Sequence, residues 1–208
     1  MAESEGVIRY QLDYRPGKLP PEADLSDLFH WFGRCRELGL IGQDPGLYEG
    51  YAYGNISIRT RRGFVISGTQ TGANPALSCE DLAWVEDFDP ARNWLKATGP
   101  ARPSSEAMTH GQIYLALPAA GAVIHAHSAL IWQQAKALRL PLTAPEAGYG
   151  TPEMAAEVRR LLTSASGDSG AFSMGGHQDG VATYARDMNT AGRLMLQLLA
   201  RATALASE

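Results

Sequence analysis

The spacing of apolar residues predicts helices in several parts of the chain. From Leu25 to Leu38 they recur at steps of three and four, which makes one apolar stripe and predicts a helix over residues 24–38. Ser104 is a suitable N-cap for a second helix, which Pro118 would end. The helices predicted after the first cover residues 104–117, 129–138, 151–162 and 187–204.

Other stretches show the alternation or the β-branched residues that are typical of strands. Residues 7–14 alternate between apolar and polar side chains, which predicts a short strand. Two runs at 55–59 and 63–67, joined by three polar residues, predict a hairpin. Further strands are predicted at 82–88, 93–97, 122–127, 171–174 and 181–185. Helices interspersed with short strands indicate a single α/β domain with helices covering a sheet that is at least partly antiparallel.

Composition and charge exclude several classes of protein. The chain has 208 residues, of which 45% are hydrophobic and 19% charged, and these values are typical of a globular protein. The net charge of −4 argues against nucleic acid as the main ligand, and no apolar stretch is long enough to span a membrane. The acidic start of the chain is unlike a secretory signal, so we expect a cytoplasmic protein whose Cys35 and Cys79 are reduced thiols.

Three histidines are candidates for a metal site. His125 and His127 lie two residues apart in a predicted strand, so both side chains point to one face of the sheet. An isolated pair of this kind is weak support for a metal. His177 lies in a glycine-rich loop between two predicted strands, where either a polar turn residue or a ligand would fit. Because a turn has no need of histidine, we favour the ligand, and three imidazoles with one open position are typical of catalytic zinc.

The segment from Pro103 to Glu106 and two glycine-containing stretches complete the candidate site. Glu106 is either an ordinary carboxylate near a helix N-terminus or a catalytic base that also meets the metal. Ser104 and Ser105, with the amides of that helix, suit an anion such as phosphate. The stretches 53–57 and 66–72 combine glycines with small polar residues, which is typical of plain turns and also of anion-binding loops.

Taken in this order, the segments resemble the class II aldolase/adducin family, from about Asp24 to Ala204. The Pro-Ser-Ser-Glu segment and the His-x-His pair at this separation are the specific part of the resemblance. It implies an αβα layered sandwich with a central, mostly antiparallel sheet, formed by residues 1–208 as one domain with residues 1–22 as an N-terminal extension. It also implies a homotetramer.

The resemblance assigns roles to individual residues. It implies that His125, His127 and His177 hold Zn²⁺, or another divalent metal such as Mn²⁺ or Co²⁺, and that Glu106 is the catalytic carboxylate of L-fuculose-phosphate-type aldolases. Such enzymes use a tyrosine from a neighbouring subunit as an acid. Here Pro145 or Glu146 falls near that place, and Tyr149, a few residues on, is the candidate. The residues that fall where the family binds substrate phosphate are Gly54, Asn55, Thr71, Gly72, Ser104 and Ser105.

The implied function is a metal-dependent lyase that cleaves a carbon–carbon bond in a small sugar phosphate or related hydroxy-carbonyl compound. This chain departs from the family pattern where Gln178 and Asp179 separate His177 from the next glycine. A methylthioribulose-phosphate dehydratase, a pentulose-phosphate epimerase and a decarboxylase are therefore alternatives on the same scaffold. The alternative that is not an enzyme is a structural module like the adducin head.

Overall fold

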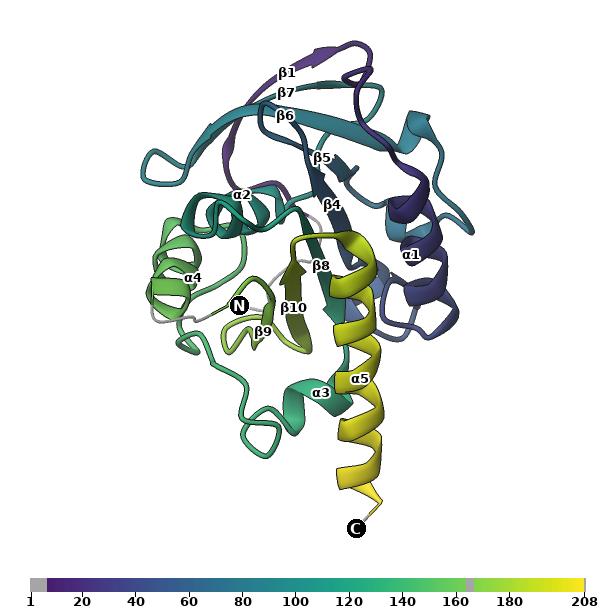
Figure 1. Cartoon of the computed structure of the whole chain (residues 1–208), viewed down its shortest axis with the longest axis vertical. Helices are drawn as coiled ribbons and strands as arrows, with labels where there is room; N and C mark the ends of the chain where they lie inside the picture. The colour runs from purple at the N-terminus through teal and green to yellow at the C-terminus, as the bar shows by residue number, and fades with distance from the viewer. Residues whose placement is uncertain (1–6, 164–166, 208) are drawn as a thin grey trace.

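The computed structural model describes residues 7–163 and 167–207, which form an eight-stranded sheet with helices on both sides (Figure 1). The α-helices are α1 (Ser26–Glu37), α2 (Ala107–Ala116), α3 (Ala129–Gln133), α4 (Pro152–Thr163) and α5 (Met188–Ala206). The strands of the large sheet are β1 (Gln11–Pro16), β4 (Asn55–Arg59), β5 (Phe64–Ser67), β6 (Leu82–Asp89), β7 (Trp94–Gly99), β8 (Ala122–His127), β9 (Gly170–Ser173) and β10 (Gly180–Ala185). A small sheet pairs β2 (Gly42–Gln43) with β3 (Ala52–Tyr53), and the short 3₁₀ helices are η1 (Tyr48–Gly50), η2 (Thr71–Ala73) and η3 (Cys79–Asp81).

The strand order is β1-β7-β6-β5-β4-β8-β10-β9, and the pairing is antiparallel everywhere in this sheet except between β1 and β7. The predicted hairpin is formed by β4 and β5. The expected layered α/β fold around a mostly antiparallel sheet is therefore confirmed.

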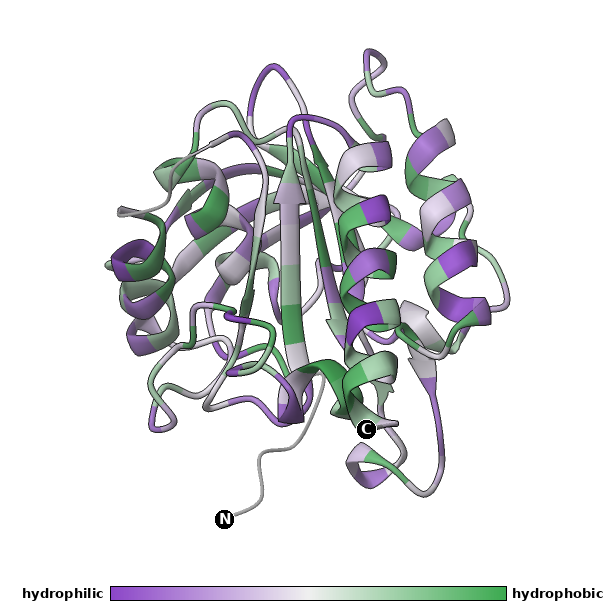
Figure 2. Cartoon of the chain, turned by 60° about the horizontal axis from the view of Figure 1, so that its bottom comes forward, coloured by the Kyte–Doolittle hydropathy of each residue, from purple (hydrophilic) through white to green (hydrophobic). Residues whose placement is uncertain are grey.

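Each strand sends alternate side chains to opposite faces of the sheet, so the two faces carry separate cores. On one face, Ile56 and Ile124 pack with residues of α1 and α5. On the other face, Phe64 and Val123 pack with residues of α2 and α4. Figure 1 shows α1 and α5 on one side of the sheet and α2 and α4 on the other, and in Figure 2 the C-terminal helix α5 carries hydrophilic and hydrophobic residues on different sides.

The N-terminal segment differs from the expectation. The strand lies at Gln11–Pro16 rather than at 7–14, and it forms a parallel edge of the main sheet beside β7. The residues expected to be a mere extension thus include part of the sheet. A parallel partner 83 positions along the chain cannot be inferred from alternation, because alternation gives a strand but not its neighbour.

Two predicted helices are shorter than expected. The one predicted over 129–138 is regular only over Ala129–Gln133 and continues as turns. The one predicted from Ser104 begins at Ala107, so that Glu106 occupies the N-cap position. The Ser104 hydroxyl still accepts a hydrogen bond from the Glu106 N–H, 3.2 Å away, and thereby begins the turn that leads into α2. No helix within residues 7–163 and 167–207 is long and apolar enough to cross a membrane.

Candidate metal centre

His125 and His127 lie on β8 and point to the face of the sheet that α2 and α4 cover. β8 is buried along its whole length between β4 and β10, and Asn55 lies directly opposite His125 in the register. The ring centroids of His125 and His127 are 5.0 Å apart. The period-two prediction for this pair is confirmed, since the strand itself places both imidazoles side by side.

His177 reaches the same place from the turn that joins β9 to β10. Two backbone hydrogen bonds close this turn, from the His177 N–H to the Met174 carbonyl (3.2 Å) and from the Gly180 N–H to the His177 carbonyl (3.0 Å). A Cβ atom on Gly180 would lie only 2.5 Å from Cδ2 of the His177 ring. Glycine at this position therefore leaves the room that the imidazole occupies.

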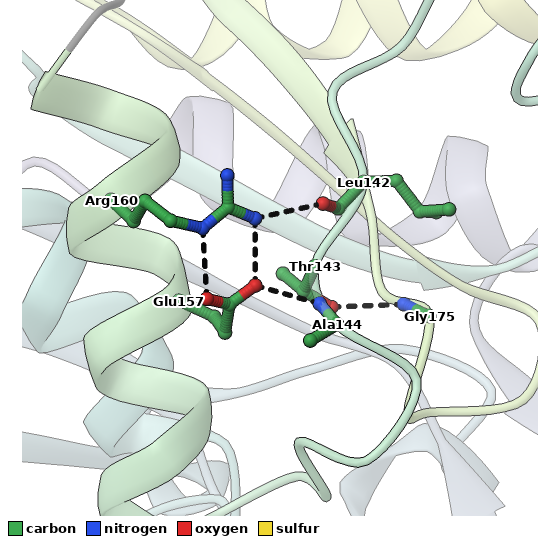
Figure 3. A network of polar contacts seen from close by, with 6 residues as sticks. All are labelled: Leu142, Thr143, Ala144, Glu157, Arg160 and Gly175. Carbon is green, nitrogen blue, oxygen red and sulfur yellow. Dashed lines mark hydrogen bonds and ion pairs between the residues drawn. The ribbon is translucent and has the colours of Figure 1, made fainter.

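The segment 142–147 supports the turn from outside. The Gly175 N–H donates to Oγ1 of Thr143 (2.9 Å), and the Ala144 N–H donates to the Glu157 carboxylate of α4 (2.7 Å). Arg160 binds the same carboxylate and the Leu142 carbonyl, which ties the segment to α4 (Figure 3). The loop that carries His177 is thus held at several points.

The three imidazoles converge. Their candidate ligand atoms all lie within 4.8 Å of one another, and Nε2 of His177 is 3.0 Å from Nε2 of His127. All three side chains are buried. Nitrogens bound to one tetrahedral zinc lie about 3.3 Å apart. Only small side-chain shifts therefore separate this cluster from a set of ligands for one ion.

Burial keeps the three rings neutral, as metal ligands must be. Desolvation lowers the pKa of His127 to about 3, partly opposed by the charge of Asp179. Desolvation, together with the neighbouring imidazoles, also places the pKa values of His125 and His177 well below the ordinary value. Neither ring nitrogen of His125 has a hydrogen-bond partner that meets standard geometry within residues 7–163 and 167–207. Neutral imidazoles are ligands that suit zinc and similar divalent metals.

Glu106 lies beside this cluster at the start of α2. Its side chain is 1% exposed, and Oε1 is 3.9 Å from Nε2 of His177. The carboxylate is therefore placed to meet either an ion at the three histidines or a substrate bound there. Tyr10 supports the same turn, because its hydroxyl donates to the Ser104 carbonyl at 2.7 Å.

The loops that carry the remaining predicted residues lie side by side. Gly68 forms a β-bridge with Pro103, and the Ser104 N–H donates to the Ser67 carbonyl (3.2 Å). The Ser67 hydroxyl in turn accepts from the Ile56 N–H (3.1 Å). The structure thus gathers three segments that carry Gly54, Asn55, Thr71, Gly72, Ser104 and Ser105.

Within these loops, the two predicted glycines pack closely against backbone. Gly54 has φ +75°, and a Cβ atom on Gly72 would lie 2.7 Å from the Tyr53 carbonyl oxygen. Each position therefore requires glycine for local packing, whatever further role it has.

Tyr149 is fully buried, and its ring centroid lies 4.9 Å from that of His177. The guanidinium of Arg9 also stacks on this tyrosine, 4.3 Å from the Tyr149 ring centroid. Arg9 contributes to the low pKa of His177 as well. Sequence reasoning missed Arg9, because the segment before β1 has no motif that links it to the site.

A cleft of about 760 Å³ opens beside His177. Tyr48 and Asp179 both line it, and the Tyr48 hydroxyl donates to Oδ2 of Asp179 at 2.7 Å. The Tyr48 ring also meets His127 edge-on, with 4.6 Å between centroids. The extra Gln178 and Asp179 are visible in the sequence, but nothing there pairs Asp179 with Tyr48.

His110, one turn after Glu106, has a partner of its own. Its Nδ1 lies 2.7 Å from the Ser57 hydroxyl, which is 2.8 Å from the Tyr114 hydroxyl. All three groups are buried. The structure therefore shows His110 in a buried polar network under the site.

The comparison with protein families agrees with this geometry. The family model described as "Class II Aldolase and Adducin N-terminal domain" matches residues 43–205. No curated protein matches the chain.

Several solved structures share the fold. An L-fuculose-1-phosphate aldolase from Thermus thermophilus aligns with a TM-score of 0.67 at 21% identity, over 88% of this chain and 92% of that chain. YgbL from Klebsiella pneumoniae, described as a putative aldolase/epimerase/decarboxylase, gives 0.63 at 17% identity, over 87% of each chain. A further L-fuculose 1-phosphate aldolase gives 0.63 at 22% identity, over 87% of this chain and 84% of that chain.

Proposed function

The chain belongs to the class II aldolase and adducin family, and from this premise we propose that it is a metal-dependent aldolase-type lyase. Its substrate would be a small sugar phosphate or a related hydroxy-carbonyl compound, in which it cleaves a carbon–carbon bond. The observation that carries the proposal is the buried cluster of His125, His127 and His177 with Glu106 beside it. Two solved structures that share the fold bear the name of fuculose-phosphate aldolases.

The three histidines would hold Zn²⁺, or Mn²⁺ or Co²⁺ in its place. A divalent ion supplies Lewis-acid stabilisation of the negative charge that develops on the substrate oxygens when the carbon–carbon bond breaks. Glu106 would carry the proton to or from the substrate carbon at which the bond is broken. Its nearly complete burial suits this role, because a carboxyl group in a water-poor site exchanges its proton with the substrate rather than with solvent.

The neighbouring loops would bind the substrate. Asn55, Thr71, Ser104 and Ser105, with the backbone at Gly54 and Gly72, would hold the anionic end through N–H and hydroxyl groups. Tyr149 would take the proton from the substrate hydroxyl that becomes the aldehyde carbonyl during cleavage, and it would act as the acid that protonates this oxygen in the reverse condensation, as the resemblance implies. The homotetramer stays a prediction of the same resemblance, and the cytoplasmic location stays a separate prediction from the sequence.

Alternatives remain among reactions that share the first step, which is formation of negative charge next to a carbonyl. A dehydratase loses water and an epimerase recombines the fragments. The description of YgbL as a putative aldolase/epimerase/decarboxylase shows that such reactions are considered for proteins of this fold. Glutamate rather than aspartate at position 106 favours the aldolase over the epimerase. An adducin-like structural module is disfavoured, because such a module does not need three converging imidazoles.

The test is the metal content and activity of His127→Ala beside a control, His30→Ala, whose histidine is exposed on α1. Elemental analysis should find about one divalent ion per chain in the wild type and in the control, and little in His127→Ala. A panel of phosphorylated ketoses, followed by aldehyde release, water loss and inversion, then assigns the reaction. If His127→Ala retains both metal and activity, the proposed site is wrong.

Glu106→Gln separates metal binding from proton transfer. We expect it to bind metal and to lose about 10²- to 10⁴-fold in kcat, since general acid–base catalysis contributes on that order. The same metal analysis and aldehyde assay measure both quantities. Unchanged kcat would remove Glu106 from the mechanism.

A further inference from the structure

An arginine outside the predicted site contacts one of its loops. Arg36, in the last turn of α1, donates from Nη1 to the Gly72 carbonyl oxygen at 2.8 Å. We infer that Arg36 is a positioning residue for the anionic end of the substrate, because it fixes the loop at Gly72 and brings a positive charge to it. The inference rests on the proposed function, in which this loop helps to hold that end. The family model begins at residue 43, so Arg36 lies outside the segment that it matches.

Gly72 lies where the loops of the candidate substrate site meet. It is buried, and a Cβ atom on it would lie 2.7 Å from the Tyr53 carbonyl oxygen, in the peptide group that joins Tyr53 to Gly54. Within residues 7–163 and 167–207, the Gly72 N–H donates to no backbone or side-chain acceptor. A buried backbone N–H without a partner is rare in folded proteins. An anionic group of the substrate would supply the acceptor.

The contact with Arg36 restrains this glycine from its carbonyl side. Glycine has more backbone freedom than any other residue, so the direction of its N–H is fixed only by its surroundings. A carbonyl held by a guanidinium cannot turn away without the loss of a charge-assisted hydrogen bond. The Arg36 contact therefore orients the backbone of Gly72 before a ligand arrives, and a site ordered in advance binds more tightly.

The charge of Arg36 acts in the same direction. Three segments form the candidate anion site and contain neither lysine nor arginine: 53–57, 66–72 and 103–106. Arg36 is half-buried and forms no ion pair with the residues that the structure describes, whereas its neighbour Glu37 pairs with Arg34. Solvent screens a partly buried charge less than an exposed one. An anion at Gly72 would thus be attracted by Arg36.

The end of α1 is also attached to the candidate metal centre. A Cβ atom on Gly42 would lie 2.9 Å from the Tyr53 hydroxyl and 3.6 Å from Nη1 of Arg36, so these two groups lie close together. The Tyr53 ring packs on His127, with 5.4 Å between centroids. The His127 N–H donates to the carbonyl of Leu40, four residues after Arg36, at 2.9 Å. Arg36 is therefore held in a defined place relative to both the loop and the histidines.

Calorimetric titration of zinc-loaded protein with inorganic phosphate, at one fixed ionic strength, tests the inference. Arg36→Met removes the charge and the donor, whereas Arg36→Lys keeps the charge without the planar fork. We expect phosphate to bind about tenfold more weakly to Arg36→Met, and Arg36→Lys to recover part of the loss. Arg34→Met is the matched control, because Arg34 is exposed on the same helix, and its phosphate affinity should stay within about twofold of the wild type.

Two further measurements separate positioning from a merely structural contact. Ser105→Ala should also weaken phosphate, since Ser105 belongs to a neighbouring segment of the same site. Urea denaturation of each variant reports stability. A merely structural contact would lower the free energy of unfolding of Arg36→Met and leave its phosphate affinity at the wild-type value. On a substrate found with the ketose panel, Arg36→Met should raise KM about tenfold and keep kcat within about twofold.

The possible outcomes separate this inference from the proposed function. The inference is overturned by wild-type phosphate affinity in Arg36→Met, by an equal loss in Arg34→Met, by phosphate binding that Ser105→Ala does not change, or by no phosphate binding at all. None of these results removes the metal site. Phosphate affinity that depends on Arg36, with no lyase activity on any ketose of the panel, would instead overturn the proposed reaction and leave the role of Arg36 in place.

Discussion

Replacing Gly180 by alanine should weaken metal binding without unfolding the protein. The new Cβ atom would lie 2.5 Å from Cδ2 of the His177 ring and 3.0 Å from the His177 carbonyl oxygen. Contacts this short force a neighbour to move. In the metal-free protein the ring can rotate away, whereas a bound ion requires it to return to its place beside His127.

The magnitude follows from this competition. Forcing one extra methyl group into a packed site costs about 1–3 kcal/mol. If the metal-bound form carries this strain and the metal-free form relieves it, zinc affinity should fall by about 5- to 150-fold, at 1.36 kcal/mol per tenfold change. The free energy of unfolding of the metal-free protein should change by less than the free energy of zinc binding changes.

Competition with a chromophoric chelator measures the zinc affinity, and urea denaturation of the metal-free protein measures stability. Gly33→Ala is the matched control, because a Cβ atom at this helical glycine of α1 meets nothing within 4 Å. The control should keep its zinc affinity and gain up to about 1 kcal/mol of stability, since alanine favours a helix over glycine. Wild-type zinc affinity in Gly180→Ala would refute the described placement of His177.

Two further predictions concern the supports of the site. The pKa of Glu157 is lowered to about 2, first by its hydrogen bond from Arg160. A carboxylate whose pKa is lowered on folding stabilises the folded state at pH values above its pKa in the unfolded chain, which is near 4.5. Glu157→Gln should therefore reduce the free energy of unfolding by about 1 kcal/mol at pH 7 and by little near pH 2. Urea denaturation at the two pH values measures this difference. Ser57→Ala would leave Nδ1 of His110 and the Tyr114 hydroxyl buried without the Ser57 hydroxyl as a partner. It should reduce the free energy of unfolding by about 1–3 kcal/mol. An unchanged midpoint of chemical denaturation would contradict the network.

Local pattern was sufficient to predict that two of the three histidines of the candidate metal centre converge. Two histidines that are two residues apart in a strand share a face, so the convergence of His125 and His127 followed from the spacing alone. The position of His177 depends on how β9, β10 and the segment 142–147 pack, and no periodicity encodes that packing. Its assignment needed the glycine-rich turn and the family resemblance, and the structure confirms that it joins the pair.

The parts that sequence reasoning missed share a physical reason. Arg9, Tyr48 and the pairing of Tyr48 with Asp179 all depend on contacts between segments far apart in the chain. Tyr48 and Asp179 also have left-handed backbones that tertiary contacts stabilise. The parallel pairing of β1 belongs to the same class, because the register of an edge strand depends on the rest of the sheet. Alternation and capping signals report only on neighbours within a few residues.

The candidate metal centre combines two levels of rigidity, and this combination determines how variants will act. His125 and His127 belong to a central strand packed on both faces, so a change near them alters the core and therefore the free energy of unfolding. His177 belongs to a turn that two backbone hydrogen bonds close and that one hydrogen bond to Thr143 and the Glu157 contacts of the adjoining segment hold from outside. Such a turn can shift locally at a free energy below that of global unfolding, because the sheet itself stays paired. Substitutions around the turn should therefore change metal affinity before they change stability, and substitutions along β8 should do the reverse.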